Sequence, residues 1–176
     1  MQVFYAPDIE GKKYTLDRSE SKHLVKVLRY REGSLLSLID GKGTLYRGIL
    51  SDASPDAATI EITETVENFE KRPYYLHLAV SPLKNPERYE WMVEKCVELG
   101  VDAITPLLCK RTERKSVKEE RLKNIVISAM KQSLKATLTA INEPADFEKF
   151  ILSRRDGRLL IPHCNTGFGR IPISSA

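Results

Sequence analysis

Residues 74–108 read YYLHLAVSPLKNPERYEWMVEKCVELGVDAITPLL, and this stretch decides the fold. It begins with a short apolar run, Leu76–Val80, which lies between two prolines and is typical of a buried strand. Asn85 and Pro86 then predict a helix start, because Asn caps free N–H groups and Pro loses no hydrogen bond there. A glycine marks the helix end, and residues 101–108 are apolar again. The stretch therefore predicts a parallel β-α-β unit.

The helix of this unit has one apolar face. Its apolar residues fall three or four positions apart, as on the buried side of an amphipathic helix: Tyr89, Met92, Val93, Cys96, Val97 and Leu99. The glutamates at the remaining positions favour a solvated face over an acid/base pair. Cys96 lies on the apolar face, which favours a small buried side chain over a reactive thiol.

The composition excludes several classes of protein. The chain has 176 residues, of which 41% are hydrophobic and 30% charged, as is typical of globular proteins. It has no apolar run of about 18 residues, so no membrane span is expected, and its N-terminus lacks the pattern of a secretory signal. Its three cysteines, Cys96, Cys109 and Cys164, are too widely spaced for a zinc site or a disulfide scaffold. We therefore expect a cytoplasmic protein with no metal site.

Residues 1–70 are expected to form a small β domain. Apolar or alternating runs predict several short strands, at residues 2–6, 34–39, 44–50 and 58–66. The sequence Asp40-Gly41 predicts a tight hairpin turn between two of them. One helical pattern covers Ser19–Tyr30, with Ser19 or Ser21 as its cap. The charged run 67–72 before a proline is the expected linker to a second domain, residues 73–176.

The second domain is the more basic one. Residues 73–176 carry 17 Lys/Arg against 12 Asp/Glu, whereas residues 1–72 carry 11 against 12. The densest basic segment, 110–118, is consistent with either a solvated loop or a phosphate contact. Further helices are expected at 118–135 and 144–152, and a third parallel strand at 157–164. Three such strands leave a sheet edge uncovered, so either a partner covers it or the chain is part of a longer design.

The residues alone do not identify a catalytic centre. The sequence has no nucleophile elbow, P-loop or dinucleotide-binding glycine motif, and its three histidines are scattered. His77 within an apolar strand favours a core residue with its polar atoms paired. His163 ends the expected third strand, at the edge where parallel sheets bind ligands, although a polar strand end is an equally good interpretation.

Several motifs together resemble a known family. These are HLVKVLR (23–29), DGKG (40–43), LKNPERYEWMVEKCVELGVDAITPL (83–107), RTER (111–114) and MKQSLK (130–135). They resemble the bacterial 16S ribosomal RNA uridine-N3 methyltransferase family (small subunit methyltransferase E, SPOUT class) over residues 1–164. The resemblance implies an α/β protein with an N-terminal β domain: a PUA-like β-barrel for RNA, followed by a SPOUT domain with a parallel sheet and a C-terminal knot. It also implies S-adenosylmethionine as methyl donor, 16S rRNA or the small ribosomal subunit as partner, and a homodimer.

Two motifs expected from this resemblance are missing. The family continues into a G-P-E-G-G-type loop and an L-G-x-x-I-L-R-x-E-T-A-type segment, which build the knot and most of the cofactor pocket, and residues 165–176 match neither. The chain thus resembles a member truncated before the knot, with an incomplete SPOUT domain. We expect these 176 residues to be inactive as an enzyme, and the alternative is a non-catalytic RNA-binding remnant.

The resemblance also implies roles for individual residues. Lys26, Arg29 and Lys42 are expected to contact rRNA phosphates. Arg88, Arg111 and Arg114 are expected to hold the backbone of the target strand. Gln132 and Lys135 would lie near the target uridine, and His163 would border the cofactor pocket. No residue is assigned as catalytic.

Overall fold

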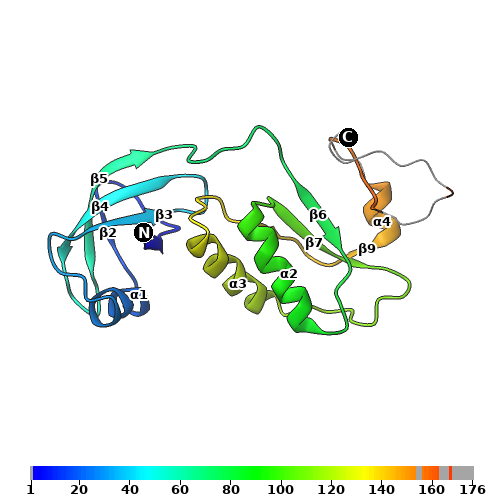
Figure 1. Cartoon of the computed structure of the whole chain (residues 1–176), viewed down its shortest axis with the longest axis horizontal. Helices are drawn as coiled ribbons and strands as arrows, with labels where there is room; N and C mark the ends of the chain where they lie inside the picture. Colours follow the sequence, from blue (N-terminus) through cyan, green and yellow to red (C-terminus); the bar gives the residue numbers. More distant parts are fainter. Residues whose placement is uncertain (1, 154–155, 163–166, 168–176) are drawn as a thin grey trace.

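The computed structural model describes residues 2–153, 156–162 and 167, which form two units joined side by side (Figure 1). The N-terminal unit is a curled sheet with two short helices at one end. The second unit is a parallel sheet with two long helices against one face. The expected fold class, an N-terminal β domain followed by α/β structure with a parallel sheet, is confirmed.

The N-terminal sheet has five strands in the order β1-β3-β4-β5-β2. They are β1 (Val3–Tyr5), β2 (Lys13–Thr15), β3 (Leu35–Ile39), β4 (Leu45–Asp52) and β5 (Thr59–Val66). β1 pairs with β3 in parallel and every other pair is antiparallel. Four of these strands match the expected runs. β2 was missed, because a three-residue edge strand with a charged and a polar end carries almost no periodic signal.

The helical segment of this unit differs from the prediction. It divides into α1 (Arg18–Lys22) and a π-helical turn, η1 (His23–Val27). The cap is Asp17, whose carboxylate accepts the backbone N–H of Glu20 at 2.9 Å, so the expected serine caps are wrong. Ser21 is instead fully buried, and its hydroxyl donates to the Leu16 carbonyl and accepts the Ala58 N–H.

The second sheet contains the predicted β-α-β unit. β6 (His77–Val80) and β7 (Ala103–Leu108) are parallel and are connected by α2 (Pro86–Leu99). The Asn85 side chain accepts the Glu87 N–H at 2.9 Å, and Gly100 ends the helix in the left-handed region at φ 83°. Both local signals therefore act as the sequence predicts.

The expected third strand at 157–164 is wrong for the residues that the structure describes. Residues 157–162 form no strand, and Leu159, Leu160 and Ile161 are more than half exposed. The parallel partner of β7 is instead split into β8 (Ala140–Ile141) and β9 (Ala145–Asp146). Pro144 lies in the gap, where its missing N–H interrupts the pairing. The last helix, α4 (Phe147–Leu152), consequently begins three residues later than expected, capped by Asp146.

The α2 helix and α3 (Glu119–Gln132) cover one face of this sheet (Figure 1). Val93, Val97 and Val126 are almost fully buried between them and the sheet. Leu99, placed on the apolar face by its spacing, is 79% exposed, because at 3.6 residues per turn it lies about 120° around the helix from the buried Val93. Cys96 is buried as expected, and burial raises the pKa of its thiol.

One of two hydrophobic clusters among the described residues is shared by the two units, and the other lies within the β unit. Val3, Ile39 and Leu45 of the β unit pack in the same cluster as the inner faces of α2 and α3. The hairpin turn also bonds to the segment after α3: Gly43 N–H donates to the Ala136 carbonyl and Leu138 N–H to the Gly41 carbonyl. The expected linker is therefore held tightly, and its Phe69 also packs against this core.

Candidate functional site

A cleft of about 840 Å³ lies between the two units. One wall is the hairpin turn at Lys42 and Gly43. Another is segment 68–75, which comprises most of the linker and the residues that follow it before β6. The third wall is the amino-terminal edge of the parallel sheet, since Tyr75, Asp102 and Thr139 each precede the start of a strand. The cleft therefore lies at the opposite edge from the one where parallel sheets usually bind small ligands.

The wall between linker and sheet is fixed by Asp102. One oxygen of its carboxylate accepts Nη2 of Arg72 at 2.8 Å, and the other accepts the Leu76 N–H at 2.7 Å. The Arg72 guanidinium also lies 5.0 Å from the ring centroid of Tyr74 and packs against Gly100, where a Cβ would come within 3.1 Å of Nη1. These contacts hold the linker in one position over the sheet.

Three lysines line the cleft from three separate segments. Lys135 bonds Glu70 at 3.3 Å across an exposed surface, and such a pair is weak in water. Lys42 and Lys71 are exposed, and neither pairs with a carboxylate among the described residues. Asp40 shapes the turn beneath Lys42, accepting the Lys42 and Thr44 N–H groups at 2.7 and 3.0 Å. Among the described residues, two of the three lysines in the cleft therefore have no carboxylate partner, whereas Lys135 and Arg72 are paired.

An exposed aromatic side chain lies in the same lining. Tyr75 is 71% exposed and has no hydrogen bond, ion pair or ring contact with another described residue. Tyr74 beside it is 59% exposed, but Arg72 covers one of its ring faces. Lysines next to a free ring are the groups that bind a nucleic-acid strand, because phosphates pair with cations and bases stack on rings.

The carboxyl edge of the sheet holds another group of predicted RNA contacts. Arg88 is exposed near the start of α2, and Arg111 is exposed in the loop after β7. Arg114 in the same loop is half-buried, and its Nε donates to the Ser116 carbonyl at 3.1 Å. Two contacts join this loop to the segment after β6, namely Ser81 Oγ to Thr112 Oγ1 at 2.6 Å and Lys84 Nζ to Glu113 at 3.2 Å.

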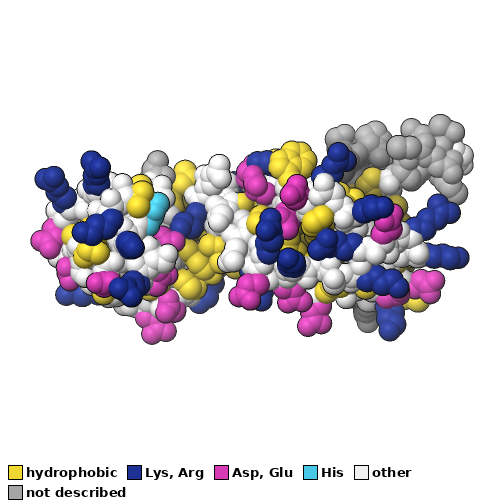
Figure 2. Space-filling view, turned by 90° about the horizontal axis from the view of Figure 1, so that it is seen from below, with side chains coloured by type: hydrophobic (Ala, Val, Ile, Leu, Met, Phe, Trp, Pro, Cys, Tyr) yellow, Lys and Arg dark blue, Asp and Glu magenta, His cyan; other side chains and the backbone are white. Residues whose placement is uncertain are grey.

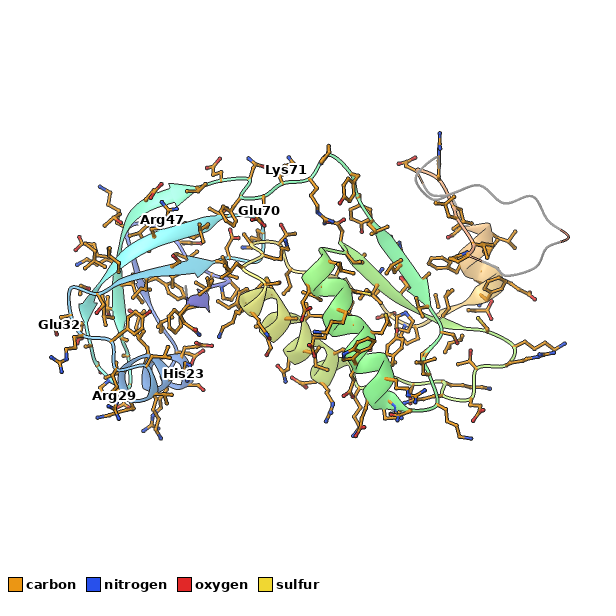
Figure 3. All side chains as sticks on the ribbon, in the orientation of Figure 1. His23, Arg29, Glu32, Arg47, Glu70 and Lys71 are labelled. Atoms are coloured by element: carbon orange, nitrogen blue, oxygen red, sulfur yellow. The ribbon has the colours of Figure 1, made fainter. Side chains whose placement is uncertain are left out.

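The remaining predicted contacts lie elsewhere. Lys26 is exposed on η1, and Arg29 follows it in a left-handed conformation at φ 57°. Figure 3 shows His23 on the small helices of the β unit and Arg29 just beyond them, both well away from Lys71 on the linker. Gln132 is exposed at the end of α3, in a shallow groove of about 320 Å³ with Glu94 and Arg121.

The structure thus divides the eight predicted RNA contacts among separate places. It brings only Lys42 and Lys135 into the cleft. His163, the predicted cofactor contact, lies outside the described residues. The sequence reasoning missed Lys71 and Tyr75, and their only sequence signal is a basic and aromatic run, KRPYY, at 71–75. Charge alone could not have located the cleft, because Lys and Arg are spread among Asp and Glu over the face in Figure 2.

His77 is a paired residue on the sheet face away from α2 and α3. Its Nε2 lies 2.7 Å from Thr105 Oγ1, which also accepts Asn142 Nδ2 at 2.9 Å. Its ring meets Phe150 of α4 edge to face, with centroids 5.7 Å apart. The expected pairing of the His77 ring is present, but the side chain is half-buried and lies outside the buried core.

Two further features are absent from the described part of the chain. Within residues 2–153, 156–162 and 167, no cluster of His, Cys, Asp or Glu side chains could hold a metal ion. Over the same residues, no helix has the length and apolar character needed to cross a membrane.

The comparison with protein families decides the classification. A family described as "RNA methyltransferase domain" matches residues 70–172, and one described as "RNA methyltransferase PUA domain" matches residues 16–63. The chain belongs to the RNA methyltransferase family. The family resemblance seen in the motifs is confirmed, and the two matched ranges fall on the parallel-sheet unit and the curled sheet respectively.

Individual relatives agree with this assignment. Ribosomal RNA small subunit methyltransferase E from Synechocystis is 32% identical over 139 residues, covering 78% of this chain and 45% of that protein. A probable rRNA-methyltransferase from Porphyromonas gingivalis has a TM-score of 0.79 at 34% identity, covering 88% of this chain and 65% of that one. The Neisseria gonorrhoeae small subunit methyltransferase E, bound to S-adenosyl methionine, has a TM-score of 0.77 at 27% identity, covering 89% and 66%. This chain thus spans about half the length of the curated relatives it matches.

Proposed function

We propose that this chain is the RNA-binding part of an S-adenosylmethionine-dependent methyltransferase that modifies N3 of a uridine in 16S rRNA. The observation that carries the proposal is the match of residues 70–172 to the RNA methyltransferase domain. It is supported by relatives named for the small ribosomal subunit and by a similar structure that binds S-adenosyl methionine. On this proposal residues 1–70 are a PUA-like RNA-binding domain and residues 73–176 the first part of the methyltransferase domain.

The chemistry of uridine explains the value of the arginines at the carboxyl edge. N3 of uridine becomes a nucleophile only when it loses its proton, which leaves a negative charge on the base. Arg88, Arg111 and Arg114 would stabilise that charge and hold the adjoining phosphates, because oriented cations lower the energy of a developing anion. Lys26, Arg29, Lys42, Gln132 and Lys135 are proposed to contact the RNA elsewhere. For Gln132 and Lys135 this replaces the expected place near the uridine, because they line the α3 groove and the inter-unit cleft respectively.

The cavity at the carboxyl edge supports a chain whose described residues lack a complete site for the methyl donor. The cavity at the carboxyl edge, beside Tyr89 and Arg114, has a volume of about 20 Å³, which is room for about one water molecule. Ligand pockets are usually about 300–1,000 Å³. The inter-unit cleft is large enough, but it lies at the other edge of the sheet and is lined by lysines. We therefore propose that these 176 residues bind RNA but neither bind S-adenosylmethionine tightly nor transfer its methyl group.

Two measurements test the proposal together. Calorimetry with S-adenosylmethionine is expected to show no micromolar binding by the 176-residue chain. Micromolar binding would refute the proposal that these residues do not bind the methyl donor tightly. A labelled 16S rRNA fragment is expected to bind with an affinity that falls steeply as salt rises. Binding that is insensitive to salt would contradict the phosphate contacts.

The same proposal covers location and assembly. An enzyme that modifies ribosomal RNA works where bacterial ribosomes are assembled, so we place the protein in the cytoplasm. We also propose that full-length members of the family are homodimers and that these 176 residues alone do not form a stable dimer. Sedimentation of the chain would settle the second point, because a stable dimer would contradict it.

A further inference from the structure

We propose that the inter-unit cleft binds a single-stranded segment of RNA that flanks the modified nucleotide, while the nucleotide itself is held at the opposite edge of the sheet. The inference rests on the proposed function and adds a second, separate RNA site to it. The cleft opens where β6, β7 and β8 begin, whereas Arg88, Arg111 and Arg114 lie near the edge where β6 and β7 end. β7 has six residues, so the two edges are about 20 Å apart.

The charge distribution favours an anionic strand in the cleft. Lys42 and Lys71 lie on two different walls and have no carboxylate partner among the described residues. The side chain of Lys135, in the segment after α3, pairs among the described residues only with Glu70, across an exposed surface. Cations on several walls of one cleft match the repeating phosphates of a strand, and a bound phosphate can replace a weak surface carboxylate.

The exposed ring favours an unpaired strand over a duplex. Tyr75 presents an unoccupied ring in the lining, and an unstacked base can lie flat against it. In a duplex the base faces are already stacked on their neighbours, so the same ring would gain little. The strand is therefore expected to bind through one stacked base and two or three phosphates.

The walls of the cleft are already in place before RNA binds. The Asp102 carboxylate holds both Arg72 and the backbone of Leu76, which fixes the chain on either side of Tyr75. The hairpin that carries Lys42 is bonded to residues 136 and 138. A preformed site loses less conformational entropy on binding than a flexible one, which favours useful affinity from few contacts.

The binding experiment uses the 176-residue chain and a fluorescein-labelled single-stranded RNA of about 12 nucleotides, followed by anisotropy over a range of salt concentrations. The double variant Lys42→Ala/Lys71→Ala is expected to reduce the slope of log affinity against log salt by about 1.4, since each single-strand phosphate contact contributes about 0.7. The double variant Lys12→Ala/Lys123→Ala removes the same charge from exposed positions outside the cleft and is expected to leave the slope unchanged.

The stacking contact has its own readout. Tyr75→Ala is expected to weaken binding about tenfold without altering the salt slope, and Tyr75→Phe, which keeps the ring, is expected to bind like the unchanged chain. A duplex of the same sequence, or polyglutamate, should compete poorly. Equal binding of duplex or polyglutamate, equal losses in the two double-lysine variants, or a loss in Tyr75→Phe would each overturn the cleft site.

Two outcomes separate this inference from the proposed function. Binding that is lost in Lys26→Ala/Arg29→Ala but kept in all cleft variants would overturn the cleft site and leave RNA binding intact. No binding of any RNA by the unchanged chain would overturn both. The flanking position is tested by replacing Tyr75 with photoreactive benzoylphenylalanine and mapping its cross-link on a 16S rRNA fragment. A cross-link to the uridine that a full-length relative methylates in that fragment would refute it.

Discussion

Replacing Asp102 with alanine is expected to destabilise the protein by about 3 kcal/mol. The carboxylate accepts one hydrogen bond from Arg72 at 2.8 Å and one from the Leu76 N–H at 2.7 Å. Each hydrogen bond to a charged group contributes about 1.5–3 kcal/mol to stability. The side chains of Arg72 and Asp102 are still 27% and 17% exposed, so each of these two bonds is expected to contribute about 1.5 kcal/mol. If the free energy of unfolding falls by about 2 kcal/mol per molar urea, the urea concentration at the unfolding midpoint would fall by about 1.5 M.

The matched control is an ion pair with the same separation on the open surface. Arg18 Nε lies 2.8 Å from Asp56, but the two side chains are 84% and 71% exposed. Asp56→Ala is therefore expected to change stability by less than about 0.5 kcal/mol. The reasoning is refuted if Asp102→Ala costs less than about 1 kcal/mol in urea unfolding, or no more than Asp56→Ala.

Three further experiments test backbone packing, alkaline stability and thiol accessibility. Gly48→Ala is expected to destabilise the protein by about 1–3 kcal/mol in urea unfolding, because the added Cβ would lie 2.7 Å from a backbone oxygen of β5, and an unchanged midpoint would contradict this. Burial raises the pKa of Tyr89 to about 12. The neutral hydroxyl therefore stabilises the fold fully below pH 10, and that contribution is lost as the pH rises toward 12. Tyr89→Phe removes the titrating hydroxyl, so it should lessen the loss of stability at alkaline pH. An identical loss in the variant and the unchanged chain would contradict this role of Tyr89. In a Cys164→Ser background, Cys109 should react with a thiol reagent at pH 8 at least about tenfold faster than buried Cys96, whose thiol pKa is raised, and equal rates would show that Cys96 is accessible.

The parts of the fold that could be predicted are those with local signals. Asn85 and Gly100 determine where α2 begins and ends through their own hydrogen bonds and backbone angles, so the sequence locates that helix to the residue. The third strand has no such signal, because β8 and β9 have two residues each and depend on the register of β7. The apolar run at 157–162 has a better strand pattern, yet it is exposed in the structure.

The cleft was harder to predict because it forms only when distant segments meet. Lys42 and Lys135 are far apart in sequence, and what brings them together is the backbone pairing of the hairpin with Ala136 and Leu138. Gly41 makes that close approach possible, since a Cβ at this position would lie 3.1 Å from the Tyr5 ring and 3.3 Å from the Leu138 side chain. The Asp40-Gly41 sequence predicts the hairpin turn, but it does not predict which segment of the second unit the turn will contact.

The shared core also affects how the chain can fold during synthesis. Val3, Ile39 and Leu45 are made early, but the helices that cover them come from the second half of the chain. The β unit consequently leaves the ribosome with an apolar surface exposed, and it reaches its final packing only after α3 has emerged. An isolated fragment that ends at the linker would keep that surface open to water and to other chains.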